Sequence, residues 1–317
     1  MDARPHVGFF YIRNIGLSQA RIDEQLAIAK HFFSLPAEEK LRYRAPLEEG
    51  NYNGYRPLGS VEVLPGLKDN LEFYNIFKFI PQTQRDQPRI IREHRDRIEA
   101  FHRHMHEHVT YRLLRLLALV LGLPDRDALV DGHAYEAPCD SSLRYMLYRA
   151  RTDDENRRYE NLYLRGHKDN GTLTYVFQQP VAALQARRAD DDAGWAYLRL
   201  PEGKVAVIMG DMLEFLSNGC IKAGIHRVVA PPREQASLDR LALLYFVRPS
   251  DRLPLTSLDT PFLTSMGYGK QGTEGDLDMS ASEWVRARVK KNWGGSVAPG
   301  EDSRAGGEGF MAKVFYS

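Results

Sequence analysis

The octapeptide HKDNGTLT, residues 167–174, places a histidine and an aspartate two residues apart at the end of an expected strand. Residues i and i+2 of a strand face the same side, so the His167 imidazole and the Asp169 carboxylate can converge on one point. A further histidine, His226, lies in a later strand candidate, GIHRVV, residues 224–229. Because a sheet that closes on itself can bring distant strands together, the sequence predicts a site formed by these three side chains.

Short strand candidates extend from this octapeptide in both directions. Turn-forming stretches such as Asp190–Gly194 and Ser217–Gly219 separate them, and residues of this kind end strands. Eight short strands at this spacing, with no helical crossover, predict a mainly β fold with a double-stranded β-helix core, a jelly roll of the cupin-like kind. The eight candidates are Leu143–Ala150, Tyr163–Lys168, Leu173–Gln178, Leu184–Arg188, Trp195–Leu200, Val205–Met209, Gly224–Val229 and Leu241–Val247.

The N-terminal third has a helical pattern with strand interruptions. Its longest expected helix runs from about Ile91 to Leu121 and carries an apolar stripe at helical spacing, formed by Ile98, Phe101, Met105, Val109, Leu113, Leu116 and Val120. Four histidines lie off this stripe, so we expect a solvated helix face for His102, His104, His106 and His108.

The pattern divides the chain into three regions. We expect an N-terminal helical and strand region over 1–125 and a catalytic β-helix core over 126–260. A C-terminal helix and a mobile tail, 261–317, are expected to pack on this core. Ser280 and Glu283 have the spacing of a capping box, which predicts where the C-terminal helix begins.

Two neutral imidazoles and one carboxylate leave coordination positions open on a metal. This ligand set is typical of non-haem iron(II) oxygenases, although zinc accepts the same ligands. Arg240 favours the first reading, because it begins an otherwise apolar strand and an arginine inside a small barrel needs an anionic partner. The far carboxylate of 2-oxoglutarate is a suitable bidentate partner, and the Tyr148 hydroxyl can complete its binding.

Other residues are candidates for contact with a substrate. Arg144 shares an inward strand face with Tyr148, since they lie four residues apart, and Asn170 lies beside the expected metal site. A structural ion pair for Arg144 and a turn role for Asn170 are equally compatible with the sequence. Phe246 is a third candidate contact; together with Phe215 and Tyr245 it suggests an apolar or aromatic small molecule.

Composition excludes several classes of partner. The 317 residues include 43 basic and 42 acidic side chains, a formal net charge of +1, which gives no electrostatic reason to expect nucleic acid. No apolar run is long enough to span a membrane, and the charged start predicts no signal peptide. With only two cysteines, Cys139 and Cys220, a disulfide framework is impossible, so we expect a cytoplasmic protein. Its oligomeric state is not determined by the sequence.

The motifs, taken in order, resemble the isopenicillin N synthase-like family of 2-oxoglutarate- and iron(II)-dependent dioxygenases over nearly the whole chain. The resemblance implies Fe(II) ligation by His167, Asp169 and His226, and binding of 2-oxoglutarate by Arg240 and Tyr148, with O₂ as the second cosubstrate. The matching segments are Gly8–Phe10, residues 32–40, Asn53–Tyr55, residues 167–174, Gly210–Leu213, Ser217–Gly219 and His226–Val229.

The chain also departs from the family pattern. Ala242 stands where the family commonly has the serine of Arg-x-Ser, and Met146 replaces the asparagine of Asn-x-Tyr. Lys168 and Asn170 replace the usual Thr/Ser and aromatic residue around the aspartate. Family-like halogenases carry a small residue at the position of Asp169, so this carboxylate favours hydroxylation, desaturation or rearrangement.

The expected function is therefore oxidation of a small organic metabolite in specialised metabolism. Three alternatives remain open at the level of sequence. They are an oxidase of the same fold that does not use 2-oxoglutarate, a zinc-dependent hydrolase, and a jelly-roll protein that binds a small molecule without catalysis.

Overall fold

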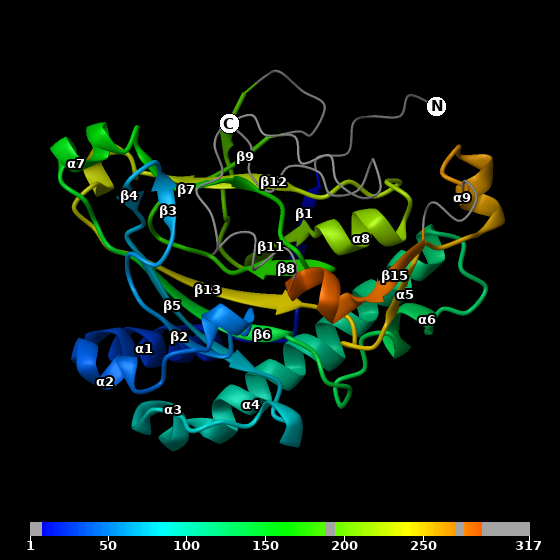
Figure 1. The fold of residues 1–317 in the computed structure, drawn as a ribbon, viewed down its shortest axis with the longest axis horizontal. Helices are drawn as coiled ribbons and strands as arrows, with labels where there is room; N and C mark the ends of the chain where they lie inside the picture. Colours follow the sequence, from blue (N-terminus) through cyan, green and yellow to red (C-terminus); the bar gives the residue numbers. More distant parts are fainter. Residues whose placement is uncertain (1–7, 188–193, 271–275, 287–317) are drawn as a thin grey trace.

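Two antiparallel β-sheets face each other at the centre of the protein (Figure 1). The computed structural model describes residues 8–187, 194–270 and 276–286. Within them the larger sheet has seven strands, in the order β1 (Phe9–Arg13), β11 (Lys204–Met209), β8 (Leu173–Val176), β13 (Arg240–Val247), β6 (Ser142–Tyr148), β5 (Leu71–Phe77) and β2 (Gly54–Arg56). The smaller sheet has four strands, in the order β10 (Ala196–Tyr197), β9 (Leu184–Arg187), β12 (Ile225–Val229) and β7 (Leu162–His167).

Consecutive strands of the catalytic region alternate between the two sheets, except that the short β10 follows β9 in the smaller sheet. Strands β7, β9 and β12 lie in the smaller sheet, whereas β8, β11 and β13 lie in the larger one. This alternation is the jelly roll that the turn spacing predicted, and each of the eight predicted strands is present with its ends moved by a few residues. The prediction of a mainly β fold with flanking helices is confirmed.

Three strands from the first 125 residues extend the larger sheet. Strand β1 pairs with β11 at one edge, and β5 pairs with both β6 and β2 near the other. Strand β5 has the sequence LEFYNIF and all seven of its residues are buried. It was not among the predicted strands, because Glu72 and Asn75 interrupt its apolar run and a strand buried on both faces lacks the alternation of apolar and polar residues.

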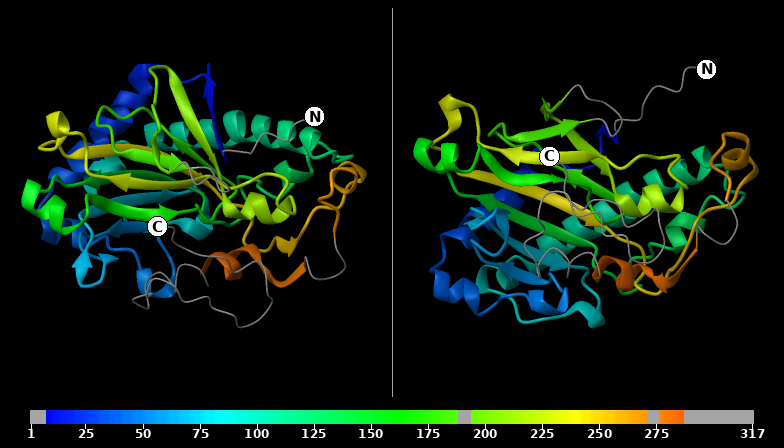
Figure 2. Two further views of the ribbon diagram at one scale, coloured as in Figure 1. Left: turned by 90° about the horizontal axis from the view of Figure 1, so that it is seen from above. Right: turned by 45° about the horizontal axis from the view of Figure 1, so that its top comes forward.

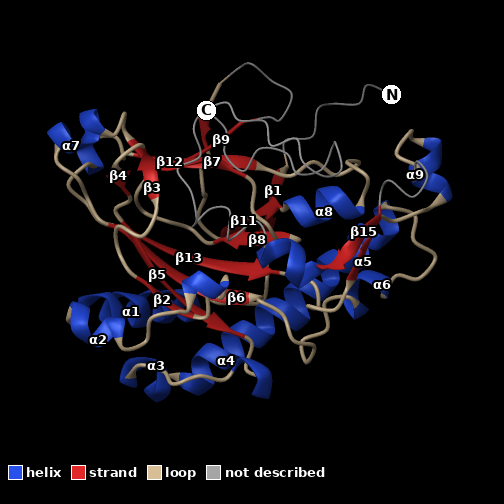
Figure 3. Ribbon diagram, in the orientation of Figure 1, coloured by secondary structure: helices blue, strands red, loops and turns tan. Residues whose placement is uncertain are grey.

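The helices of the first 125 residues cover the outer face of the larger sheet, which is the face turned away from the smaller sheet (Figures 2 and 3). Helix α1 contacts strands β6 and β13 directly. The helices of the described residues are α1 (Gln19–Ser34), α2 (Ala37–Leu41), α3 (Arg89–Glu93), α4 (Arg95–Arg103), α5 (Tyr111–Val120), α6 (Ala128–Asp131), α7 (Asp153–Arg158), α8 (Asp211–Leu216) and α9 (Pro261–Ser265).

The expected long helix is interrupted, and this changes which residues it buries. Helices α4 and α5 are joined by a wide π turn, His104–Thr110, in which Tyr111 donates its backbone N–H to the carbonyl of His106. A π turn adds one residue to the helical repeat, so the buried stripe moves one position along the chain. Beyond the turn the buried residues are Leu114, Ala118 and Leu121, whereas the predicted Leu116 and Val120 are 56% and 59% exposed.

The prediction of a solvated face for the four histidines is wrong for two of them. His102 and His106 are completely buried. The Tyr245 hydroxyl lies 2.9 Å from His106 Nδ1 and 3.2 Å from His102 Nδ1. The helical period alone could not show this, because these imidazoles find hydrogen-bond partners on the sheet and in the following loop.

Each face of the larger sheet has its own hydrophobic cluster. Leu143, Tyr145 and Leu147 of β6 point outward into the cluster beneath the helices. Met146 and Tyr148 of the same strand point inward, into the cluster between the two sheets. This alternation decides which residues can reach the space between the sheets.

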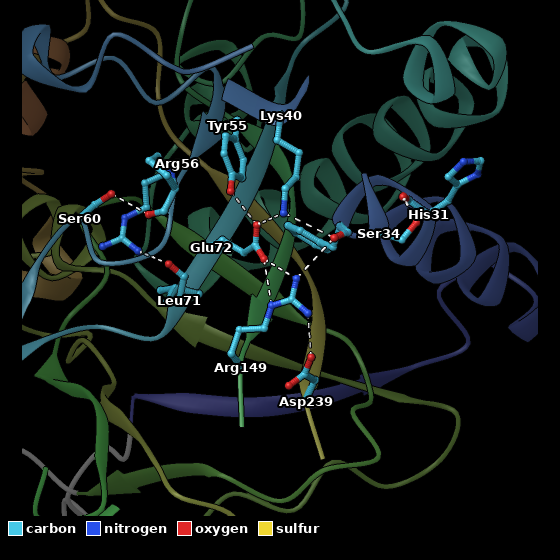
Figure 4. Close-up of polar contacts among 12 residues, drawn as sticks. His31, Ser34, Lys40, Tyr55, Arg56, Ser60, Leu71, Glu72, Arg149 and Asp239 are labelled. Carbon is cyan, nitrogen blue, oxygen red and sulfur yellow. Dashed lines mark hydrogen bonds and ion pairs between the residues drawn. The ribbon is translucent and has the colours of Figure 1, made fainter. Parts of the chain in front are cut away.

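A buried ion-pair network joins the N-terminal helices to the outer face of the sheet (Figure 4). The Glu72 carboxylate of β5 is fully buried and accepts hydrogen bonds from Lys40 Nζ at 2.7 Å, from the Tyr55 hydroxyl at 2.7 Å and from Arg149 Nη2 at 2.7 Å. Arg149 also pairs with Asp239 at 2.9 Å. Since Arg149 follows Tyr148 and Asp239 precedes Arg240, this pair ties the end of β6 to the start of β13.

Two short hairpin-like pairs complete the described structure: β3 (Glu62–Leu64) with β4 (Leu67–Lys68), and β14 (Pro254–Thr256) with β15 (Asp276–Ser280). The predicted capping box is present: Glu283 accepts from Ser280 N at 2.7 Å and donates its own N–H to Ser280 Oγ at 3.4 Å. Residues 281–286 are helical. The rest of the expected C-terminal helix and the expected tail lie outside the described residues.

Candidate active site

The three side chains predicted from the HKDNGTLT motif and the GIHRVV strand meet at one point. His167 ends β7 and lies directly opposite His226 of β12 in the smaller sheet. Asp169 Oδ1 is 3.7 Å from His167 Nε2, and Asp169 Oδ2 is 3.8 Å from His226 Nε2. One ligand atom from each residue lies within 4.8 Å of the other two, which is the spacing of ligands around a single ion.

Backbone carbonyls orient both imidazoles. His167 Nδ1 is 2.9 Å from the carbonyl oxygen of Arg165, and His226 Nδ1 is 3.1 Å from that of Gly224. A carbonyl oxygen only accepts, so each Nδ1 carries the proton and each Nε2 keeps its lone pair. Both lone pairs are thus available for a metal, in the arrangement that second-shell hydrogen bonds produce in metal sites.

The electrostatics of His167 and Asp169 favour metal-binding protonation states. Burial and the neighbouring His226 lower the pKa of His167 to about 4, so this imidazole is neutral at physiological pH. Burial raises the pKa of Asp169, but His226 and His167 outweigh this effect and hold it below its ordinary value. A carboxylate with two neutral imidazoles is the 2-His-1-carboxylate set of non-haem Fe(II) sites.

Close backbone packing holds the loop that carries Asp169. The N–H of Asp211 donates to the Asp169 carbonyl at 2.8 Å, at the start of α8. A Cβ on Gly210 would lie 1.9 Å from the Gly171 carbonyl oxygen, so a side chain cannot fit there. The Gly210–Leu213 motif is therefore explained by the space that this loop leaves.

The larger sheet contributes a buried guanidinium at one end of its inner face. Arg240 begins β13 opposite Tyr148 of β6, and its Cζ lies 5.1 Å from the centre of the Tyr148 ring. Arg240 is 3% exposed, burial lowers its pKa, and it donates from Nη2 to the side-chain amide of Gln179. Its Nε has no hydrogen-bond partner among the described residues, so this end has the capacity to bind an anion.

A second guanidinium lies further along the same face. Arg144 Cζ is 4.1 Å from the centre of the Phe73 ring and 4.3 Å from that of Phe246. Arg144 Nε donates to the side-chain oxygen of Asn75 at 2.7 Å. Thus Arg144 and Phe246, two of the predicted substrate contacts, touch one another.

These groups line one cavity of about 200 Å³ between the two sheets. Its wall includes the three converging residues, Arg240 with Tyr148, and all three predicted substrate contacts, Arg144, Asn170 and Phe246. Tyr245 and Phe215 do not line it: Tyr245 faces the helices, and Phe215 of α8 packs in a third cluster with Trp284. Tyr245 is one residue from Phe246, so strand alternation turns the two side chains to opposite faces.

Sequence reasoning missed several residues of this cavity. Two residues come from β5, the strand that was not predicted: Phe73, which lines the cavity, and Asn75, which accepts a hydrogen bond from Arg144. Gln179 lines the cavity from the loop after β8. The only available signal for the first two was the two-residue spacing of Leu71, Phe73 and Asn75. Nothing in the sequence indicated that Gln179 lies against Arg240.

Known proteins share both the sequence pattern and the fold. Residues 1–98 match the family described as non-haem dioxygenase in morphine synthesis N-terminal, and residues 139–249 match the 2OG-Fe(II) oxygenase superfamily. The chain belongs to the 2OG-Fe(II) oxygenase superfamily. It is accordingly an oxidoreductase of the dioxygenase class, in a family that uses Fe(II), 2-oxoglutarate and O₂.

Individual members of this superfamily align over most of the chain. A 2-oxoglutarate-dependent dioxygenase of Aspergillus fumigatus is 27% identical over 90% of this chain and 81% of its own. A full-length Neurospora crassa protein, solved with alpha-KG and 5-formyluracil, superimposes with a TM-score of 0.74 at 22% identity, over 90% of this chain and 86% of the other. JOX2, solved with 2OG, Fe and JA, has a TM-score of 0.65 at 22% identity, over 89% and 82%.

The sequence has no apolar run long enough to span a membrane, and the helices of the structure can be compared with this prediction. Among the helices of the described residues, none has the length and apolar character needed to cross a bilayer.

Proposed function

We propose that this dioxygenase oxidises a small organic metabolite of specialised metabolism by hydroxylation, desaturation or oxidative rearrangement. In this proposal His167, Asp169 and His226 hold Fe(II), and Arg240 with Tyr148 binds the far carboxylate of 2-oxoglutarate. The observation that carries it is the convergence of three ligand atoms within 4.8 Å on a cavity whose wall also contains Arg240.

The donor set of the described residues fits both groups. The two Nε2 lone pairs and the Asp169 carboxylate offer one face of ligands to the metal, and a facial set leaves open positions. For 2-oxoglutarate the donor is Arg240, which is buried and donates its described hydrogen bond to the side-chain amide of Gln179. A carboxylate of the ligand would therefore neutralise the charge of Arg240 without competing with a protein carboxylate. Ala242 occupies the position of the family's serine and has no hydroxyl to offer 2-oxoglutarate. The polar side chains beside Arg240 are those of Gln179 and Tyr148.

When bound, Fe(II) supplies the chemistry that couples decarboxylation of 2-oxoglutarate by O₂, to succinate and CO₂, with the two-electron oxidation of a substrate. The residues of this chain bind, orient and exclude water. The carbonyls of Arg165 and Gly224 keep the imidazole protons on Nδ1, away from the ligand positions. The apolar side chains between the sheets, such as Met146, Val176 and Ile208, limit access of water to the cavity.

A small-molecule substrate is supported by the cavity between the two sheets and by the relatives. Solved relatives are described in complex with 5-formyluracil and with JA, both small molecules. In this chain Phe73 and Phe246 give the cavity aromatic surface beside Arg144. We therefore infer a substrate with an apolar or aromatic part, in contact with Phe246, Asn170 and Arg144.

The test is release of succinate from 2-oxoglutarate by the Fe(II)-loaded chain in a screen of candidate metabolites. A true substrate should stimulate this release, and a variant with His167→Ala should release none. Oxygen uptake that does not require 2-oxoglutarate would instead indicate an oxidase. Preferential binding of zinc with hydrolysis of a substrate would indicate a hydrolase, and failure to bind Fe(II) would indicate a binding protein.

A further inference from the structure

Most of the cationic side chains that line the cavity have a carboxylate partner in the protein, and Arg144 differs from them in this respect. Arg56 pairs with the buried Asp69, Arg248 pairs with Asp140 at 3.2 Å, and Lys168 pairs with Glu214 at 2.6 Å. These three positive charges are therefore neutralised by protein carboxylates.

Arg144 has no such partner among the described residues. Its described hydrogen bond is from Nε to the neutral side-chain oxygen of Asn75, at 2.7 Å. Asn75 is in turn held by its own Nδ2, which donates to the carbonyl of Tyr52 at 2.9 Å. This leaves the two terminal nitrogens of Arg144 without a described hydrogen bond, in a side chain that lines the cavity. Arg144 is half-buried, and a positive charge partly removed from water with so little compensation is costly, which favours an anionic ligand.

The surroundings hold the guanidinium in place while preserving its charge. The rings of Phe73 and Phe246 lie 4.1 Å and 4.3 Å from its Cζ, so the group is confined between two aromatic side chains. Burial lowers the pKa of Arg144 to about 10, which still leaves it cationic at physiological pH. An anion in the cavity can therefore bind the terminal nitrogens of a charged guanidinium that two aromatic rings hold in place.

The position of Arg144 separates it from the proposed cosubstrate site. Arg144 and Tyr148 lie on the same face of β6, four residues apart, which corresponds to about 13 Å along a strand. Arg240 is opposite Tyr148 in the register, whereas Arg144 is opposite Leu244, near Phe246 and Thr174. Arg144 and Asp169 both line the cavity, and their opposite charges attract one another.

We propose that Arg144 is the anchor for a carboxylate group on the substrate, and that Phe73 and Phe246 hold the apolar part next to it. This rests on the proposed function and adds to it the chemical class of the substrate, an apolar monocarboxylate. A carboxylate matches the fork of one guanidinium and neutralises its single charge. A phosphate monoester carries close to two charges and would call for a second uncompensated cation.

Binding is measured first, without turnover. The Fe(II)-loaded full-length chain is kept anaerobic with excess 2-oxoglutarate, so that Arg240 is occupied, and is titrated by calorimetry with phenylacetate, 3-phenylpropanoate and octanoate. Each acid is compared with its neutral primary amide and, for the aromatic case, with phenyl phosphate. We expect at least one acid to bind, with an affinity at least 10-fold higher than that of its amide.

Variants assign that preference to a residue. Arg144→Met should weaken binding of the acid by about 10- to 100-fold and leave that of the amide nearly unchanged, because a hydrogen bond to a charged group is lost. Arg144→Lys should recover part of the affinity. Arg248→Met is the matched control, since it removes a cavity arginine that already has a carboxylate partner, and it should keep the preference for acid over amide.

Several results would overturn the proposal. They are binding of none of the acids, an Arg144→Met variant that keeps the preference, tighter binding of phenyl phosphate than of every acid, or a loss of 2-oxoglutarate affinity in Arg144→Met as large as that in Arg240→Met. None of these affects the proposed function, which is judged by succinate release. A wild-type chain that never converts 2-oxoglutarate would overturn the proposed function, while the anaerobic titrations would still decide the role of Arg144.

Discussion

The two faces of the larger sheet differ in how far the protein itself pairs the polar groups that it buries there. On the outer face, under the helices, the Glu72 carboxylate has three different donors, and the Tyr245 hydroxyl lies within hydrogen-bond distance of two histidines. On the inner face, Arg240 and Arg144 are held by side-chain amides. Neither has a carboxylate partner among the described residues.

This difference separates polar groups that stabilise the fold from polar groups that are available to bind a ligand. A buried polar group that is fully satisfied by the protein contributes to the specific arrangement of helix and sheet. A buried charge that the protein leaves uncompensated is costly, and such cost is typical of sites that wait for a ligand. The comparison therefore predicts that inner-face substitutions change activity and binding, whereas outer-face substitutions change stability.

The largest expected effect is loss of a proposed metal ligand on the cavity side. Asp169→Ala should reduce substrate-dependent succinate release by at least about 1,000-fold, because the metal's contribution to catalysis is worth several kcal/mol. Unfolding by urea should remain cooperative. Asp154→Ala, at an exposed aspartate paired with Arg157, is the control and should keep normal activity. Normal activity of Asp169→Ala would contradict the proposed metal site.

The next effect concerns stability, on the outer face. Glu72→Ala removes the acceptor shared by Lys40, Tyr55 and Arg149 and leaves the buried Lys40 ammonium without its carboxylate partner, whereas Arg149 keeps Asp239. We expect the free energy of unfolding to fall by about 3–5 kcal/mol, measured by urea denaturation. Glu48→Ala, at the exposed ion pair with Arg44, should change it little. An unchanged stability of Glu72→Ala would show that the network contributes nothing net.

A smaller effect distinguishes the two inner-face arginines. Arg240→Met should raise the KM for 2-oxoglutarate by about 10- to 100-fold, the effect of losing hydrogen bonds to a charged group. Arg144→Met should leave this KM within about twofold, since it lies on the other part of the face. Steady-state kinetics with varied 2-oxoglutarate gives both values. An equal rise in the two variants would mean that both arginines bind the cosubstrate.

The remaining expected effect is a gradual pH dependence of stability, to which buried histidines on the outer face contribute. Burial lowers the pKa of His106 to about 3 and that of His133 to about 4. The unfolded chain protonates both near pH 6.5, so it binds more protons than the folded chain in the window from about 6.5 down to 4. Stability contributed by these neutral imidazoles should therefore be complete above this window and decline on acidification.

Each histidine should contribute a slope of up to about 1.4 kcal/mol per pH unit inside this window. Urea unfolding of the metal-free chain at pH 7.5, 6 and 5 measures the total slope. His133→Gln should reduce it, and His31→Gln, at an exposed position of α1, should not. A slope in His133→Gln equal to that of the wild type would remove His133 from this account.

Particular elements show where sequence reasoning was sufficient. The short strand candidates such as Leu143–Ala150 and Leu241–Val247, with turn-forming stretches between them, predicted the strands of the roll. The two-residue spacing of His167 and Asp169 predicted their convergence, and His226 followed from a single further strand. Their metal-binding role, like that of Arg240 and Tyr148, stays a proposal, although the geometry places the residues where that proposal needs them.

Other elements show where it failed. The π turn at His104–Thr110 shifts the buried stripe of α5 by one residue, and nothing in the sequence pattern showed the extra residue. Strand β5 is buried on both faces and so has no alternation to read. Phe73 could not be assigned to the cavity, nor Asn75 to Arg144, until β5 was paired with β6.

The sequence by itself determined the strand and turn pattern, the two motifs of the three-residue site and the superfamily, because these depend on local spacing along the chain. Only the tertiary structure decided which arginines have carboxylate partners and which do not. Pairing depends on strands that are distant in sequence: Asn75 reaches Arg144 from β5, and Asp239 reaches Arg149 across β6 and β13. The charge left uncompensated in the cavity is therefore a property of the folded chain, and composition could not show it.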